Sequence, residues 1–144
     1  MTTADQLVQV FYDNFTAYFR SHVAHVNIVG RNFASDHKLL QKVYEDLQAQ
    51  IDVLAEILRT INEFMPDDLQ TVMDDSSIPN NPIVGDSIEL ISRVYDDLEI
   101  LKGCYEELII SAEEEGHSEI ANYAQERVLA IAKHCWMLKA TLES

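Results

Sequence analysis

Residues 25 to 37 read His25-Val26-Asn27-Ile28-Val29-Gly30-Arg31-Asn32-Phe33-Ala34-Ser35-Asp36-His37, and this stretch separates two long amphipathic patterns. Gly30 ends the first pattern, because glycine just past the last periodic residue is a common helix C-terminal signal. Ser35 or Asp36 can cap the start of the second pattern. The stretch therefore predicts a helical hairpin with one histidine on each side of its turn.

Apolar residues recur every three or four positions in four segments, which predicts four long helices. These helices are expected at residues 4–29, 35–64, 85–115 and 118–142, and Ser118 is the expected cap of the last. The apolar stripes that should face the core include Phe19, Val26 and Ile88.

The segment 67–84 connects the second and third helices and is rich in Asp, Ser, Asn and Pro. It could hold a short helix at residues 68–73. A connection this long crosses the length of a bundle. Two helical hairpins joined by such a crossover are typical of the ferritin-like four-helix bundle, so we expect one all-α domain over residues 1–144.

Composition narrows the class of protein. The chain has 144 residues, 47% of them hydrophobic, and a formal net charge of −15 without any basic stretch. Binding of duplex DNA usually needs clustered Lys or Arg. No apolar run approaches the roughly 20 residues of a membrane span, and no export signal is visible, so we expect a cytoplasmic protein. Cys104 and Cys135 are expected to be small buried side chains rather than zinc or redox groups.

The first two predicted helices carry imidazoles and carboxylates that are candidate metal ligands. The first hairpin contains His22, His25 and His37, and the second helix carries Asp52 and Glu56. Taken singly, such residues more often hydrogen-bond within the protein or face solvent than bind a metal. A hairpin nevertheless places His25 beside His37, and residues four apart such as Asp52 and Glu56 share one helix face.

The spacing within the second helix predicts a site shared by two chains. His37 and Asp52 differ by about 60° in direction but by about 22 Å along the axis, so they cannot share a metal within one chain. If two such helices pack antiparallel across a twofold axis near Tyr44 and Glu45, His37 of one lies beside Asp52 and Glu56 of the other. This arrangement makes two identical sites whose ligands suit Fe(II), and also Zn(II).

Three fragments of the chain resemble one known family. Residues 25–37 are similar to the pattern H-W-N-x-x-G-x-x-F-x-x-x-H of the Dps family, the mini-ferritins also called DNA-binding proteins from starved cells. Residues 52–57 resemble its D-x-x-A-E-R, and residues 136–140 its W-M-L-x-A. The resemblance covers most of the chain and agrees with the helix count and the crossover.

The resemblance implies a function. Dps proteins are hollow shells of twelve bundles with ferroxidase sites at twofold interfaces. The two family histidines fall on His25 and His37, and the carboxylates from the neighbouring subunit fall on Asp52 and Glu56. Fe(II) bound there is oxidised, preferably by hydrogen peroxide, and Fe(III) is stored in the cavity. We therefore expect an iron-binding ferroxidase and iron-storage protein that limits oxidative damage, and a homododecamer.

Three positions depart from the family pattern. Gln41 replaces an Asp, which weakens the ligand set because an amide carries no charge. Val26 replaces a Trp that could donate electrons, with Tyr44 as a substitute. Ile57 replaces an Arg, which removes an ion pair. A site with one ligand fewer could be slower or could prefer zinc.

Acidic residues flank the predicted turn between the last two helices: Glu113, Glu114, Glu115 and Glu119. The resemblance implies threefold pores lined near this turn, with Glu115 and Glu119 as candidates, while a solvated helix end explains them equally well. A shell of twelve chains would carry about −180 formal charges, and no Lys or Arg precedes the first helix. We therefore expect DNA binding to be weak or absent.

Other functions fit the sequence less closely. One is the same shell with a weakened site that holds zinc or little metal. Another is a di-iron site inside one bundle, which needs Glu-x-x-His on two helices, whereas the only example here runs from Glu114 to His117 across Gly116. The last is a helical adaptor without metal, which leaves the spacing of His and acidic residues unexplained.

Overall fold

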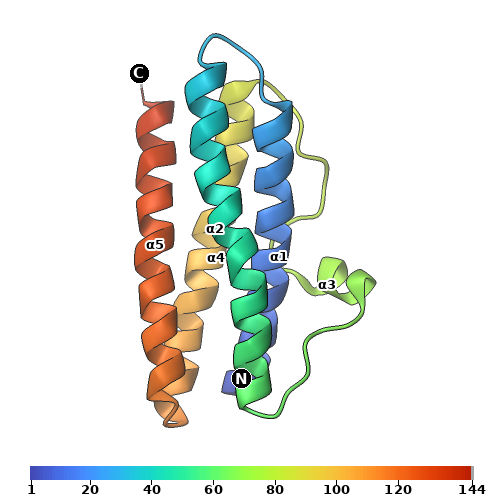
Figure 1. Ribbon diagram of the computed structural model, residues 1–144, viewed down its shortest axis with the longest axis vertical. Coiled ribbons are helices and arrows are strands. Elements are labelled where there is room, and N and C mark those ends of the chain that lie inside the picture. The colour runs from blue at the N-terminus through green and yellow to red at the C-terminus, as the bar shows by residue number, and fades with distance from the viewer. Residues whose placement is uncertain (144) are drawn as a thin grey trace.

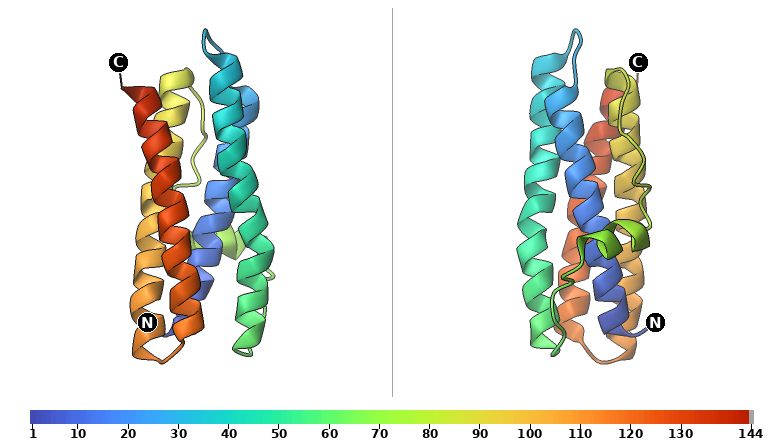
Figure 2. Two further views of the ribbon diagram at one scale, coloured as in Figure 1. Left: turned by 60° about the vertical axis from the view of Figure 1, so that its left-hand side comes forward. Right: turned by 90° about the vertical axis from the view of Figure 1, so that its right-hand side faces the viewer.

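The computed structural model describes residues 1–143, which form helices joined by tight turns and one long connection (Figure 1). The helices are α1 (Thr3–Asn27), α2 (Phe33–Thr60), α3 (Leu69–Asp75), α4 (Ser87–Glu114) and α5 (Ser118–Leu142). α1 and α2 form one antiparallel hairpin, and α4 and α5 form the other. The connection carrying α3 climbs the outside of the bundle, so that α2 and α4 run in the same direction (Figures 1 and 2). The predicted four-helix bundle with a long crossover and a short helix within it is confirmed.

The end of α2 differs from the sequence prediction. The helix stops at Thr60 rather than near residue 64. Asn62 takes the left-handed conformation with φ of 66°. The N–H of Asn62 bonds to the carbonyl of Arg59 at 3.2 Å, and that of Glu63 to the carbonyl of Leu58 at 3.0 Å. This is a Schellman motif in which asparagine takes the place usually held by glycine, so no glycine marks the end of α2 in the sequence.

Two of the expected helix caps are wrong. Asn32 precedes α2 and His117 precedes α5, and neither makes a side-chain cap hydrogen bond. The caps expected at Ser35 or Asp36 and at Ser118 lie inside the helices instead. Tight turns from the preceding helices set both starting points, so local capping chemistry does not decide them.

A buried ion pair fastens the crossover to the bundle. Arg20 of α1 donates from Nε to Asp97 of α4 at 2.6 Å, and both side chains are almost fully buried. Arg20 also donates from Nη1 to the carbonyl of Asn81 at 2.7 Å. Burial raises the pKa of Asp97, against the lowering influence of Arg20. The pair therefore joins α1, α4 and the connection in one place.

Apolar side chains from all four long helices fill one continuous core. Three residues expected in the core are instead exposed, namely Phe19 by 55%, Val26 by 61% and Ile88 by 67%. Phe19 and Val26 are seven residues apart and share an outer face of α1, whereas Ile88 lies in the first turn of α4. Cys135 is buried and Cys104 is half-buried, and both are free thiols. Within residues 1–143, no helix is both long and apolar enough to cross a bilayer.

Candidate metal centre

His25 and His37 lie face to face where α1 ends and α2 begins. Their ring centroids are 3.8 Å apart with an interplanar angle of 17°. Phe33 packs near the His37 ring, with centroids 4.8 Å apart. His25 is buried and His37 is half-buried. The hairpin therefore brings the two imidazoles together, as the sequence predicted.

Each of these histidines is fixed by the backbone of the other. The Nδ1 atom of His25 lies 2.7 Å from the carbonyl oxygen of His37, and Nδ1 of His37 lies 2.7 Å from the carbonyl oxygen of His25. A carbonyl oxygen can only accept, so each Nδ1 carries the proton, and Nε2 of a neutral ring keeps its lone pair. Metal-binding histidines usually donate their second ring N–H in this way. The hydrogen bonds therefore fix both rings and leave Nε2 of each without a bond to the backbone of the other.

The two carboxylates lie elsewhere on α2. Asp52 and Glu56 are exposed and one helical turn apart. Asp52 is fifteen residues beyond His37 on the same helix, about 22 Å along its axis. No group of three or more His, Cys, Asp or Glu that could hold a metal ion occurs among residues 1–143. Within one chain the imidazole pair and the carboxylate pair are therefore two separate groups.

A third histidine and two tyrosines extend the aromatic cluster. His22 stacks on Tyr44 with ring centroids 4.0 Å apart and an angle of 7°. Tyr44 also lies 4.9 Å from the His25 ring, and the hydroxyl of Tyr18 is 3.0 Å from Nδ1 of His22. In the sequence, His22 stands out only as one of the three histidines of the first hairpin. The four-residue spacing of Tyr18 and His22 was the available signal.

Comparison with known proteins identifies the family. A family model described as a ferritin-like domain matches residues 4–144. The chain is 28% identical to the "DNA protection during starvation protein" of Brevibacillus brevis, with 99% of each chain covered. The chain belongs to the Dps family of ferritin-like proteins. Among solved structures it is similar to a Dps protein from Bacillus brevis (26% identity, TM-score 0.92, covering 98% of this chain and 95% of that one). It is also similar to Helicobacter cinaedi CAIP (27% identity, TM-score 0.90, 99% and 100% covered).

The three departures from the Dps pattern have defined surroundings. Gln41 lies one turn after His37 and is half-buried, and its Nε2 donates to Oε1 of Glu45 at 2.8 Å. Val26 is exposed, and Ile57 packs against the core. The position where the Dps pattern has a carboxylate therefore holds a neutral amide that is already engaged along its own helix.

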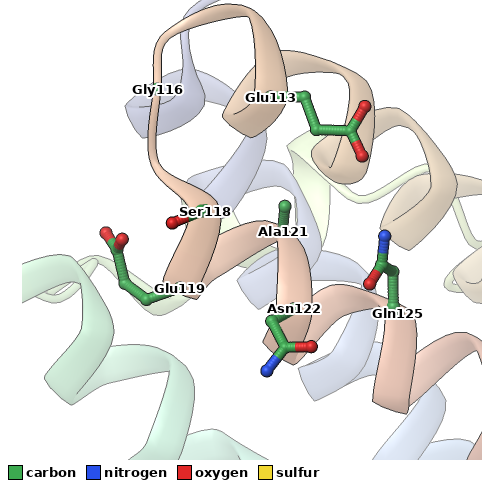
Figure 3. A pocket seen from close by; sticks show the side chains of 7 residues that line it. All are labelled: Glu113, Gly116, Ser118, Glu119, Ala121, Asn122 and Gln125. Atoms are coloured by element: carbon green, nitrogen blue, oxygen red, sulfur yellow. The ribbon is translucent and has the colours of Figure 1, made fainter.

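The acidic turn between α4 and α5 separates the two pore candidates. The carboxylate of Glu115 accepts a hydrogen bond from the backbone N–H of Thr3, and hydrogen bonds from Thr3 lower the pKa of Glu115. Oε1 of Glu119 lies 3.6 Å from Nδ1 of His117. Glu119 and Glu113 border an open hollow of about 610 Å³ that does not include Glu115 (Figure 3). Glu115 thus fastens the N-terminus, whereas Glu119 borders the hollow.

Polar side chains bridge α2 and α5 in this Dps-family bundle. Arg127 donates to both carboxylate oxygens of Asp46, at 3.0 and 2.7 Å, and Nε2 of His134 lies 2.8 Å from Asp46 Oδ2. Nearby, the hydroxyl of Tyr123 donates to Oε1 of Gln50 at 2.7 Å. Burial raises the pKa of Asp46, but hydrogen bonds from His134 and Arg127 outweigh it and lower the pKa to about 2. Asp46 is therefore an ionised anchor for Arg127 rather than a free metal ligand.

Proposed function

We propose that this chain forms a hollow, twelve-subunit shell in the cytoplasm that binds Fe(II), oxidises it and stores Fe(III) in its cavity. Hydrogen peroxide is the preferred oxidant in this proposal. The free state of both cysteines suits the reducing cytoplasm. Membership of the Dps family supports an iron-binding mini-ferritin, and the ligand geometry supports the ferroxidase step.

The observation that carries this proposal is the reciprocally bonded imidazole pair. His25 and His37 each donate Nδ1–H to the other's carbonyl, which leaves two Nε2 lone pairs on neighbouring rings. Two nitrogen ligands without a carboxylate leave an Fe(II) site incomplete. The missing oxygen ligands are Asp52 and Glu56 of a second chain.

Twofold symmetry supplies those carboxylates. In an antiparallel pair of α2 helices, the midpoint between His37 and Asp52 falls near Tyr44 and Glu45. An axis there brings His37 of one chain opposite Asp52 and Glu56 of the other, and it generates a second, identical site. Imidazole with carboxylate and open positions is the ligand set of non-haem Fe(II) oxygen chemistry.

The charge of the chain fits iron as the substrate. A net charge of −15 per subunit attracts cations toward the shell. Glu119 beside the open hollow at the α4–α5 turn offers a carboxylate on a path for entering Fe(II). The same charge opposes direct binding of DNA, so any protection of DNA is chemical, through removal of Fe(II) and peroxide.

A second candidate function rests on Gln41. This neutral amide replaces a hard anionic ligand and donates to Glu45. The shell could then hold zinc, which accepts four ligands of mixed nitrogen and oxygen type, or little metal at all. The alternative predicts zinc binding without oxidation of Fe(II).

Stoichiometric oxidation of Fe(II) separates the two candidates. Fe(II) is added to the assembled protein without oxygen, peroxide is then added, and Fe(III) formation is followed by ultraviolet absorbance. The proposal predicts that His37→Ala lowers the rate at least about tenfold while the shell stays assembled. Lys38→Ala, an exposed neighbour on the same helix, is the control and should react like the unaltered protein. No oxidation in any of the three proteins would favour the alternative, whereas equal, measurable rates in all three would contradict the role of His37.

A further inference from the structure

A tyrosine bonded to an imidazole lies one ring away from the candidate metal ligands. The Tyr18 hydroxyl and His22 Nδ1 are 3.0 Å apart, and both residues are half-buried. His22 stacks on Tyr44 at 4.0 Å, and Tyr44 lies 4.9 Å from His25. The Tyr18 and Tyr44 rings are 6.4 Å apart. A continuous series of ring contacts therefore leads from the phenol of Tyr18 to His25, a candidate metal ligand.

The proposed ferroxidase reaction needs an electron that this series of ring contacts could carry. Reduction of hydrogen peroxide to water takes two electrons, and one Fe(II) supplies one. Gln41 lacks the charge that would help to hold a second iron at the same place. A site with a single Fe(II) is therefore one electron short of reducing peroxide completely, and an unmatched electron releases hydroxyl radical.

We propose that Tyr18 supplies the missing electron, with His22 as acceptor of its proton and Tyr44 as the ring that connects it to the site. This inference rests on the proposed function. The Tyr18 O–H bond breaks, its proton moves to Nδ1 of His22, and its electron passes through Tyr44 and His25 to the peroxide-derived oxidant. With two protons from solvent, one Fe(II), one tyrosine, one imidazole and one hydrogen peroxide give Fe(III), a tyrosyl radical, an imidazolium and two waters.

The geometry of the Tyr18–His22 pair suits this role. Oxidation of a phenol makes it strongly acidic, so a base must already be in hydrogen-bond contact for the proton to leave with the electron. His22 accepts at Nδ1 in the tautomer that carries its proton on Nε2. Flat stacking on Tyr44 holds the imidazole ring in place.

The other hydrogen-bonded tyrosine pair lacks these features. Tyr105 and Tyr123 have hydroxyls 3.4 Å apart, and Tyr123 donates to the amide oxygen of Gln50. Neither has a histidine as hydrogen-bond partner. Burial raises the pKa of Tyr105, which lies wholly in the core. That pair offers no base for a leaving proton.

Electron paramagnetic resonance on the assembled shell tests the inference. The shell is loaded with one Fe(II) per subunit without oxygen, mixed with one equivalent of peroxide and frozen, and a parallel sample contains a spin trap. We expect a tyrosyl radical and little trapped hydroxyl radical. Tyr18→Phe should abolish the tyrosyl signal and raise the amount of trapped hydroxyl radical. His22→Phe keeps a ring against Tyr44 but removes the base, so it should lower the radical yield although Tyr18 is present.

Tyr95→Phe is the matched control, because Tyr95 is also half-buried on a long helix but lies outside this aromatic cluster. It should keep the signal. A second experiment uses a photochemical one-electron oxidant in place of iron and peroxide, and the radical should again depend on Tyr18 and His22. Iron oxidation without a tyrosyl signal, or a signal that survives Tyr18→Phe, would overturn the inference alone. Absence of iron oxidation in the unaltered protein would overturn it together with the proposed function, and the photochemical experiment would show whether the pair still reacts.

Discussion

The Asp46–Arg127 bridge between α2 and α5 makes a quantitative prediction about stability. Asp46→Asn keeps the size of the side chain but removes its charge, leaving the buried guanidinium of Arg127 without a counter-ion. The pKa of Asp46 is about 2 in the folded chain against an ordinary 3.8. That difference corresponds to about 2 kcal/mol of folding free energy at neutral pH. We expect the substitution to cost about this much, and more if Arg127 finds no other partner.

The pH dependence gives the prediction a sign. Because folding lowers the pKa of Asp46, its contribution is complete above the unfolded pKa and disappears as the pH falls through the folded value of about 2. The difference in free energy of unfolding between the unaltered protein and Asp46→Asn should therefore be constant near neutrality and shrink below about pH 4.

Urea unfolding at one fixed subunit concentration measures this difference, because assembly makes stability depend on concentration. Asp67→Asn, which removes the same charge from an exposed residue of the connection, is the control. A gap below about 0.5 kcal/mol at pH 7, or one that grows on acidification, would refute the reasoning.

Three further predictions concern the metal site, the surface and the backbone. Gln41→Asp restores a charged ligand beside the imidazole pair, and it should tighten Fe(II) binding at least about tenfold in calorimetry without oxygen, with unchanged affinity counting against the role of this position. In a gel-shift assay at physiological salt the assembled protein should leave duplex DNA unshifted, and a tight complex would contradict the electrostatic argument. Gly85→Ala should destabilise by about 1 kcal/mol or more, because φ is +138° and the new Cβ would lie 2.8 Å from Cβ of Glu89, a capping-box partner of α4. Thermal melts at one fixed subunit concentration measure this loss, and Gly103→Ala, with open space around it, is the control and should be neutral or stabilising.

The fold could be predicted from sequence because its signals are strong and local. Long stripes with helical spacing fixed the four main helices, and the polar segment before Gly85 marked the crossover. Helix ends were less predictable, because Asn62 adopts a left-handed conformation that glycine usually takes. The exposure of Phe19 and Val26 was missed because spacing alone does not say how wide a face the neighbouring helices cover.

The candidate site could be predicted only in part. The spacing in the sequence predicted that His25 lies beside His37, because a helical hairpin places such residues side by side. It also predicted that both lie far from Asp52 and Glu56, because the rise of a helix fixes distances along its axis. The reciprocal bonds to backbone carbonyls and the stacking of His22 on Tyr44 depend on side-chain rotamers and exact helix rotation, which no sequence pattern encodes. How two chains meet stays a prediction.

Mixing two inactive variants tests the shared site most directly. One variant carries His25→Ala and His37→Ala, and the other carries Asp52→Ala and Glu56→Ala. Each alone should fail to oxidise Fe(II). If each site combines imidazoles from one chain with carboxylates from another, shells reassembled from an equal mixture should regain about one quarter of the original sites, because half of the pairs are mixed and each mixed pair has one intact site. Activity that stays absent in mixed shells of normal size, or that either variant retains alone, would contradict the account.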